Sequence, residues 1–257
     1  MRYEHILVSA DAGLATITMN RPERRNALSE AHMRELIAAL GAAGDQSDTR
    51  AVILAANGPV FSAGHDFGDM VERDLDGMRR LLATCTELML TLQCLPQPVV
   101  AKVQGLATAA GCQLVASCDL AVAVEEASFA TPGGKGGWFC HTPSVAVVRA
   151  IGAKRALELA LTGDPIDART ALAWGLVNRV VPSAELDAAV RAFTEIIVAR
   201  SRTVVAAGKQ AFYRQIDLGL GPAYELAGDA MACNLLEPDA HEGIDAFVEK
   251  RAPKWGD

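Results

Sequence analysis

Apolar residues in the first half of the chain form short runs that predict β-strands. Residues 6–8 and 14–19 flank a glycine turn, and the second run alternates partly between apolar and polar positions, as strands do. Residues 51–55 (AVILA), 99–103 (VVAKV) and 120–124 (LAVAV) are almost continuously apolar. Such runs are typical of strands that are buried on both faces. The pattern therefore predicts buried strands at the centre of the fold.

Helical spacing follows several of these strands. Ser29 is a candidate N-cap, and apolar residues at positions 33, 36, 37 and 40 lie on one face of the helix that follows. Gly41 and Gly44 are expected to end this helix. A longer amphipathic helix is expected from about residue 74 to residue 92. Thr142 and Pro143 are expected to be the N-cap and the first residue of another helix.

The last quarter of the chain is almost wholly helical in pattern. We expect helices at residues 184–200, 201–216, 222–235 and 239–250. The preceding alternation of strands and helices shows no sharp break in composition, which favours one continuous α/β core. We therefore divide the chain into a core over residues 1–195 and a C-terminal helical region over residues 196–257.

The composition is that of an ordinary globular protein, with 257 residues of which 51% are hydrophobic and 21% are charged. The net charge of −7 argues against a nucleic-acid surface, because phosphate binding needs clustered lysine and arginine. No run is long and apolar enough to span a bilayer, and the N-terminus lacks the apolar core of a signal peptide. The six cysteines include no Cys-x-x-Cys pair, so we expect reduced thiols in a cytoplasmic protein and no metal site.

Two glycine-containing turns carry the candidate chemistry. Residues 105–119 (GLATAAGCQLVASCD) read as a turn after a strand that leads into a helix, and residues 60–66 (VFSAGHD) form a second turn of similar character. A helix N-terminus presents free N–H groups and the positive end of the helix dipole. A site of this kind suits a reaction in which a carbonyl oxygen gains negative charge.

The order and spacing of five segments resemble the crotonase (enoyl-CoA hydratase/isomerase) superfamily. These are residues 20–29 (NRPERRNALS), 61–66 (FSAGHD), 103–112 (VQGLATAAGC), 161–166 (LTGDPI) and 173–177 (AWGLV). The resemblance implies an α/β fold of the ClpP/crotonase type, a spiral of repeated ββα units with a C-terminal helical region used in trimerisation. It also implies an acyl-CoA thioester as ligand, with coenzyme A as part of the substrate, no other cofactor, and a homotrimer or a dimer of trimers.

By the same resemblance, the backbone N–H groups of His65 and Ala110 are the two donors of an oxyanion hole. The adjoining turn residues Ala63, Gly64 and Gly111 then lie against the substrate. Removing one such donor typically costs about 3–4 kcal/mol of transition-state stabilisation. The alternative is that both segments are merely tight turns.

Hydratases of this superfamily use two glutamates, which correspond to Gln113 and Gly133 in this sequence. A glutamine amide can orient a ligand or a water molecule but has no titratable proton, and a glycine offers only its backbone. A positioned general acid or base contributes roughly 10²–10⁴-fold to the rate. We therefore expect a poor conventional hydratase, in which Gln113 orients ligand or water and Gly133 only contacts the substrate.

Other polar and aromatic residues of these segments each have two interpretations. His141 lies near the position at which some relatives carry a catalytic aspartate, so it is either a general acid or base or an inert residue at a helix N-terminus. Asp66 either contacts the substrate or holds its turn together. Trp138 and Phe139 either wall the acyl pocket or pack in the core. Arg25 is either a contact for coenzyme A or a solvated surface charge.

Three functions remain open at this point. The first is an enzyme that stabilises the enolate of a thioester in a reaction other than simple hydration, such as isomerisation or thioester hydrolysis. The second is a protein that binds acyl-CoA with little or no turnover. The third is an RNA-binding relative, which the acidic charge balance disfavours. We expect the acyl-CoA thioester and further copies of this chain as partners, and no nucleic acid or membrane.

Overall fold

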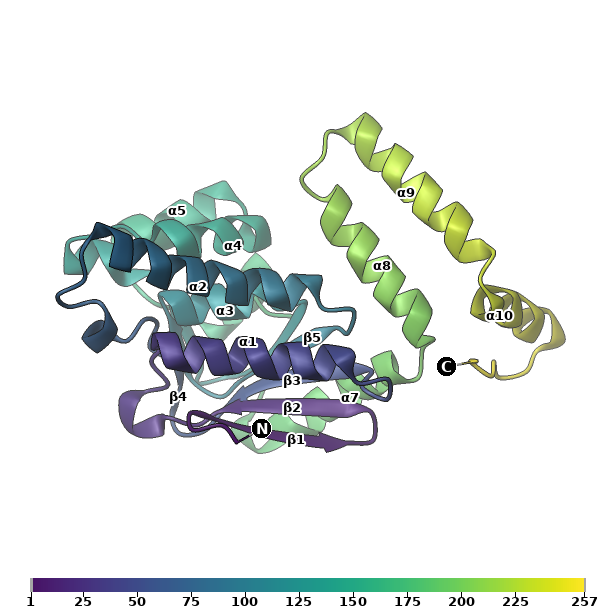
Figure 1. The fold of residues 1–257 in the computed structure, drawn as a ribbon, viewed down its shortest axis with the longest axis horizontal. Coiled ribbons are helices and arrows are strands. Elements are labelled where there is room, and N and C mark those ends of the chain that lie inside the picture. The colour runs from purple at the N-terminus through teal and green to yellow at the C-terminus, as the bar shows by residue number, and fades with distance from the viewer. Residues whose placement is uncertain (1, 257) are drawn as a thin grey trace.

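The computed structural model describes residues 2–256 as an α/β core followed by a helical arm (Figure 1). The larger sheet has the strand order β1-β2-β3-β5-β7-β10, and only β1 runs antiparallel to its neighbour. Its strands are β1 (Ile6–Asp11), β2 (Leu14–Met19), β3 (Ala51–Ala56), β5 (Val99–Val103), β7 (Leu120–Val124) and β10 (Arg179–Val181). The three continuous apolar runs thus form the central strands, as predicted.

A second sheet of very short strands lies beside the first. It has the order β4 (Val60–Ser62), β6 (Leu106–Thr108), β8 (Ser128–Ala130) and β9 (Ile166–Asp167), and only β9 is antiparallel. Long strand, short strand and helix follow one another in β3-β4-α2, β5-β6-α3 and β7-β8-α4. The helices of these units are α2 (Leu75–Cys94), α3 (Ala110–Ser117) and α4 (His141–Ile151). This repetition of ββα units confirms the predicted crotonase-like fold.

Helix α1 (Glu30–Asp45) begins as predicted and ends later than predicted. The Ser29 side chain accepts the His32 N–H at 3.2 Å and so caps the first turn. The helix passes through Gly41 and Gly44, so the expectation that these residues end it is wrong. A glycine costs only about 1 kcal/mol in a helix, and burial of Leu40 offsets that cost.

Three further helices complete the core: α5 (Ala153–Thr162), α6 (Ala168–Trp174) and α7 (Leu186–Val198). Helix α4 begins at His141, before the predicted Thr142 cap. The Cys140 carbonyl already accepts the Ser144 N–H at 3.1 Å, which closes the first helical turn. Pro143 lies inside that turn, where the missing N–H costs nothing.

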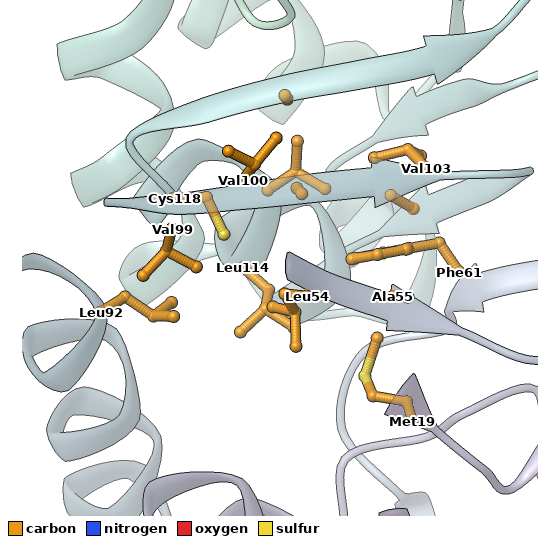
Figure 2. Packing of buried hydrophobic residues seen from close by; sticks show 14 of the residues in the cluster. Met19, Leu54, Ala55, Phe61, Leu92, Val99, Val100, Val103, Leu114 and Cys118 are labelled. Atoms are coloured by element: carbon orange, nitrogen blue, oxygen red, sulfur yellow. The ribbon is translucent and has the colours of Figure 1, made fainter. Parts of the chain in front are cut away.

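The hydrophobic core fills the space between the larger sheet and the helices α1, α2 and α3 (Figure 1). Figure 2 shows Leu54 of β3 and Val99 of β5 on the side of the sheet that faces Leu92 of α2 and Leu114 of α3. All four side chains are at most 1% exposed. Burial of each aliphatic side chain contributes about 1.5–3 kcal/mol relative to exposure, which fixes α3 against the sheet.

The C-terminal arm consists of α8 (Arg202–Gln215), α9 (Leu220–Leu235) and α10 (Pro238–Glu249), and it extends away from the core (Figure 1). Lys209 of α8 fastens the arm to the core through an ion pair with Asp119 at 2.7 Å. Its ammonium group also donates to the carbonyls of Leu92 and Gln97. The helical region is therefore present as predicted, and the boundary at residue 195 stays a prediction.

The remaining sequence expectations concern metals, membranes and thiols. Within residues 2–256, no helix is long and apolar enough to cross a membrane, and no cluster of three histidine, cysteine or acidic side chains is arranged to hold a metal ion. The six cysteines are free thiols. Burial raises the pKa of both Cys85 and Cys112 to about 12, so these side chains are neutral thiols at pH 7.

Candidate active site

The two glycine-containing turns lie side by side because their strands pair. Strands β4 and β6 are parallel neighbours, with Ser62 opposite Ala107. The carboxyl ends of parallel strands meet at one edge of a sheet, so the residues after Ser62 and after Thr108 emerge together. Strand β8 continues this edge, and the Ala109 N–H donates to the Ala130 carbonyl at 2.9 Å.

The first turn lies along residues 25–28 like a short strand. The Ala63 N–H donates to the Arg25 carbonyl at 3.0 Å, and the Asp66 N–H donates to the Leu28 carbonyl at 3.2 Å. The Gly64 carbonyl in turn accepts the Leu28 N–H at 2.8 Å. His65 forms a parallel bridge with Leu28, and the next N–H along the chain, that of Asp66, points at Leu28, so the His65 N–H points to the other side. In the described part of the chain it donates no hydrogen bond.

The second turn presents the N-terminus of α3. Ala110 is the first residue of this helix, and no acceptor among residues 2–256 takes its N–H. Ala109, which precedes it, has φ +52° and ψ −119°. Such a conformation costs an alanine of order 1–3 kcal/mol. The helix thus starts abruptly, with strained backbone directly before a free N–H group.

Two glycines allow the turns to touch. A Cβ atom on Gly64, whose φ is +86°, would lie 2.9 Å from Ala109 Cβ and 3.1 Å from the Ala110 nitrogen. A Cβ atom on Gly111 would collide with the carbonyl of Ser62. Only glycine fits at either position without displacing the neighbouring turn. Because the two turns are in contact, the free N–H groups of His65 and Ala110 lie on adjoining segments of the chain.

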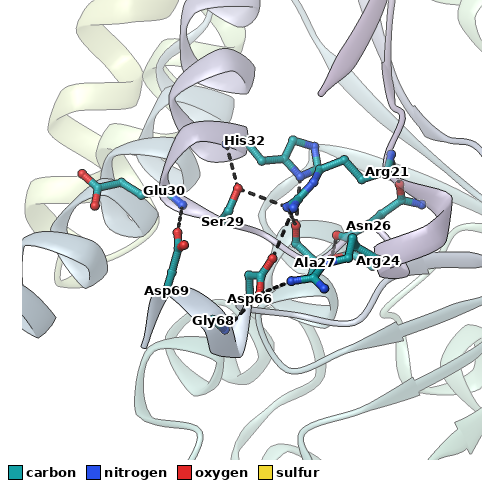
Figure 3. A network of polar contacts seen from close by, with 11 residues as sticks. Arg21, Arg24, Asn26, Ala27, Ser29, Glu30, His32, Asp66, Gly68 and Asp69 are labelled. Carbon is teal, nitrogen blue, oxygen red and sulfur yellow. Dashed lines mark hydrogen bonds and ion pairs between the residues drawn. The ribbon is translucent and has the colours of Figure 1, made fainter. Parts of the chain in front are cut away.

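A polar network holds the first turn to residues 21–29 (Figure 3). Arg21 contacts Asp66 Oδ2 at 3.3 Å, and Arg24 approaches Asp66 Oδ1 at 3.6 Å. Asp66 Oδ1 also accepts the Gly68 N–H at 3.0 Å. Of the two interpretations of Asp66, these contacts favour the one in which it stabilises its own turn.

The His65 side chain is enclosed by the protein. Both ring nitrogens are buried, and within the described residues neither reaches hydrogen-bond geometry, although the backbone of Leu28 lies close enough to the ring to favour its charged form slightly. Burial lowers the pKa of His65 below its usual value of 6.5, so the imidazole is neutral at pH 7.

Gln113 and Gly133 are both buried, and close neighbours surround Gly133. Gln113 is 4% exposed, and its Oε1 contacts the Cys85 thiol at 4.0 Å. The Gly133 N–H donates to the Cys140 sulfur at 3.2 Å. A Cβ atom on Gly133 would lie 2.9 Å from both the Cys140 sulfur and the Trp138 carbonyl oxygen. The Cys140 thiol therefore occupies space that any larger residue at position 133 needs.

The remaining candidates lie at the rim of this region. His141 is exposed at the start of α4, and its ring packs against Phe139 with centroids 5.1 Å apart. No hydrogen bond found among residues 2–256 connects the His141 ring to either turn. Trp138 is 48% exposed and meets Phe67 edge to face at 5.7 Å. Arg25 is exposed, with φ +53°.

Sequence reasoning missed Arg21 and Phe67. Arg21 lies within residues 20–29, one of the segments that resemble the superfamily. Its partner Asp66 is 45 positions further along the chain, and no local pattern predicts that pairing. Phe67 directly follows the first turn and is 62% exposed. An aromatic residue next to a functional turn is the only signal that the sequence offers for it.

Comparison with known proteins identifies the family. Residues 9–257 match the family model described as Enoyl-CoA hydratase/isomerase. The chain belongs to this family. It is 46% identical to the enoyl-CoA hydratase domain-containing protein 3, mitochondrial, of Rattus norvegicus over 244 residues, which cover 95% of this chain and 81% of the rat protein. The human protein of the same name is also 46% identical, over 95% of this chain and 80% of its own length.

Solved structures agree with this assignment. An enoyl-CoA hydratase structure from Mycobacterium smegmatis matches with a TM-score of 0.96 and 48% identity, covering 99% of this chain and 100% of that one. The crystal structure of human enoyl Coenzyme A hydratase domain-containing protein 3 matches with a TM-score of 0.95 and 44% identity, covering 98% and 100%. The resemblance to the crotonase superfamily is thereby confirmed, as is the C-terminal helical region.

The expectation of a cytoplasmic protein is contradicted by these comparisons. The curated relatives from rat, mouse and human that share 46% of the sequence are all named mitochondrial. Unpaired thiols indicate a reducing compartment. They do not show which reducing compartment it is, so the cysteines could not identify the cytoplasm.

Proposed function

We propose that this chain binds an acyl-CoA thioester and stabilises the enolate form of its carbonyl through the backbone N–H groups of His65 and Ala110. The observation that carries the proposal is that these two amides have no acceptor in the described chain and lie on adjoining turns. Gly64 and Gly111 permit that approach, and Ala63 is held to residue 25 behind them. Two fixed N–H donors are the arrangement that suits a carbonyl oxygen with growing negative charge.

The local electrostatics support this role. Ala110 begins α3, so the positive end of the helix dipole adds to the attraction for an oxyanion. The ring of His65 is neutral at pH 7 because burial lowers its pKa. The stabilisation then comes from fixed dipoles, which need little reorganisation during the reaction. The strained backbone of Ala109 is consistent with a segment held for function.

The reaction itself is proposed to differ from simple hydration. Gln113 orients a water molecule or the ligand, and Gly133 contributes only backbone, so the two proton-transferring glutamates of a hydratase have no equivalent here. Isomerisation or thioester hydrolysis fits a site that has oxyanion donors and a weak acid–base apparatus. His141 is the acid–base candidate, because its exposed ring lies at the start of the helix that follows the Gly133 segment.

The substrate and the assembly are proposed from the same region and from the arm. Trp138 and Phe139 form a wall of the acyl pocket, and Arg25 contacts coenzyme A. The arm has an apolar groove of about 850 Å³ between α8 and α9, and exposed apolar side chains such as Tyr224 and Phe247. Such a surface supports self-association as a homotrimer or a dimer of trimers. No cofactor other than the coenzyme A of the substrate is part of the proposal.

A second candidate is an acyl-CoA-binding protein with little or no turnover. The packing of Gly133 against the Cys140 thiol favours it, because this packing closes the place at which a second catalytic carboxylate would lie. Binding without consumption distinguishes this candidate from the first.

The deciding experiment follows the loss of enoyl-thioester absorbance of crotonyl-CoA at high protein concentration, with binding measured on the same sample by calorimetry. We expect binding and little hydration. Rapid hydration would contradict our interpretation of Gln113 and Gly133. Absence of binding would contradict the proposed function itself. Binding without hydration leads to a panel of acyl-CoA thioesters, in which isomerisation and thioester hydrolysis are followed separately.

A further inference from the structure

We propose that Arg21 and Asp66 are positioning residues that aim the His65 N–H at the thioester carbonyl. This inference rests on the proposed function, because it concerns the donor that the proposed function assigns to His65. It adds a mechanism for holding that donor, through an ion pair between two segments that are distant in sequence (Figure 3).

The backbone bonds of the first turn do not by themselves fix the direction of the His65 N–H. The Gly64 carbonyl and the Asp66 N–H both bond to Leu28, one on each side of His65. These bonds orient the turn relative to residues 25–28. They fix the direction of the His65 N–H only if residues 25–28 are themselves held in place. Any tilt of that segment is passed directly to the free N–H.

The guanidinium group of Arg21 joins residues 27–29 to the first turn. Its guanidinium donates to the Ala27 carbonyl at 2.9 Å and to the Ser29 hydroxyl at 3.1 Å, on one side of the site. It also donates to Asp66 Oδ2 at 3.3 Å, on the other side. The fork of N–H groups in arginine is rigid, so these contacts fix the two segments relative to each other.

The ion pair between Arg21 and Asp66 is largely buried. The exposed fractions of the Arg21 and Asp66 side chains are 14% and 10%. Solvent and salt screen such a pair far less than an exposed one. Asp66 uses its other oxygen for the Gly68 N–H, so the carboxylate is fixed on both sides.

The segment that Arg21 holds has a strained backbone. Arg25 and Asn26 both have left-handed backbone, with φ +53° and +49°. The Asn26 amide donates to the carbonyls of Asn57 and Val60 at 2.8 Å, and its oxygen accepts the Arg21 N–H at 2.9 Å. A strained segment needs such contacts to keep its conformation. Arg21 thus bonds both to this segment and to Asp66 of the first turn, and so stabilises the two together.

The test uses crotonyl-CoA bound to the full-length protein and reads the carbonyl stretching frequency of the bound thioester by infrared difference spectroscopy. Donation by two N–H groups lowers this frequency, and the lowering depends on hydrogen-bond alignment. The variants are Asp66→Asn, which keeps an acceptor for Gly68 but removes the charge, and Arg21→Lys, which keeps the charge but loses the planar fork. Asp69→Asn is the matched control, because it removes the carboxylate of the short helix that follows Asp66, keeps an oxygen that can accept the Glu30 N–H, and leaves Arg21 untouched.

We expect the unaltered protein and Asp69→Asn to show the same lowered frequency, and Arg21→Lys and Asp66→Asn to lose at least half of the lowering. Calorimetric affinity for crotonyl-CoA should change less than threefold, because both variants leave the Ala110 N–H and the N-terminus of α3 in place. Full lowering in either folded variant would overturn the positioning role. A frequency in the unaltered protein equal to that of free crotonyl-CoA would instead refute the proposed oxyanion site, so the two failures are distinguishable.

Discussion

A single methyl group added at Gly133 tests whether the site is closed to a side chain at this position. In Gly133→Ala, the new Cβ atom would lie 2.9 Å from the Cys140 sulfur and 2.9 Å from the Trp138 carbonyl oxygen, with the Cys140 nitrogen at 3.1 Å. Two of these neighbours are backbone atoms and cannot turn away. The change therefore forces the segment between Gly133 and Cys140 to move.

The expected cost follows from these contacts. Overpacking of a closed site costs about 1–3 kcal/mol. Loss of glycine from the unfolded chain returns about 0.4–1 kcal/mol, because the backbone of Gly133 is compatible with alanine. The net destabilisation is then centred at about 1.3 kcal/mol, which corresponds to a Tm lower by about 3–5 °C in a chain of this size. Thermal unfolding followed by circular dichroism measures it.

Gly134→Ala provides the matched control. A Cβ atom there would have no neighbour nearer than 3.7 Å, so this variant should be as stable as the unaltered protein or slightly more stable. Equal Tm values for Gly133→Ala and Gly134→Ala would refute the reasoning. Adding Cys140→Ala to Gly133→Ala should recover part of the lost stability, because it removes one of the two closest contacts.

The same geometry predicts the behaviour of a hydratase-like variant. Glutamate at position 133 needs the same Cβ position as alanine, so the double variant Gln113→Glu, Gly133→Glu should gain little hydration of crotonyl-CoA. Addition of Cys140→Ala gives the new carboxylate more room, and we expect any gain in hydration to require it. A double variant that hydrates crotonyl-CoA rapidly with Cys140 intact would show that the segment adapts.

Three further predictions concern stability. Lys209→Met should cost about 3–5 kcal/mol in denaturant unfolding because it leaves Asp119 buried without its cation, whereas Lys135→Met, at an exposed ion pair, should cost at most about 1 kcal/mol. Ala109→Gly should raise the free energy of unfolding by about 1 kcal/mol, because glycine adopts φ +52° without strain; an unchanged or lower value would contradict a strained turn. Burial lowers the pKa of His32 to about 4, so stability should fall by up to ~3 kcal/mol as the pH drops from about 6.5 to about 4. His32→Leu should remove that part of the pH dependence, and a variant that keeps it would locate the effect elsewhere.

The sequence predicts β1, β2, β3, β5 and β7 of the larger sheet, but neither β10 nor the strands of the smaller sheet. Continuous apolar runs such as residues 51–55 predict buried strands without any knowledge of their partners. Strands β4, β6 and β8 are only three residues long, too short for a period to be visible, and their pairing depends on contacts across the whole core. The two turns can be predicted from their sequence motifs. Their contact through Gly64 and Gly111 is visible only in the structure.

Some features of the candidate site can likewise be predicted from the sequence, and others cannot. The free N–H of Ala110 could be expected from the start of a predicted helix, because the first N–H groups of any helix lack partners. The free N–H of His65 depends on its pairing with Leu28, which no local rule predicts. The obstruction of Gly133 by Cys140 also requires the structure, since it arises from the path of the backbone between them.

The ammonium group of Lys209 has a consequence for the order in which the chain folds during synthesis. It bonds the Leu92 carbonyl at the end of α2 and the Gln97 carbonyl just beyond it, from 117 and 112 positions further along the chain. When the core first leaves the ribosome, these carbonyls and the Asp119 carboxylate have no cation, and water must solvate them. The nascent core therefore remains hydrated at this place until α8 emerges, and its completion depends on a helix that is made after every strand of the two sheets.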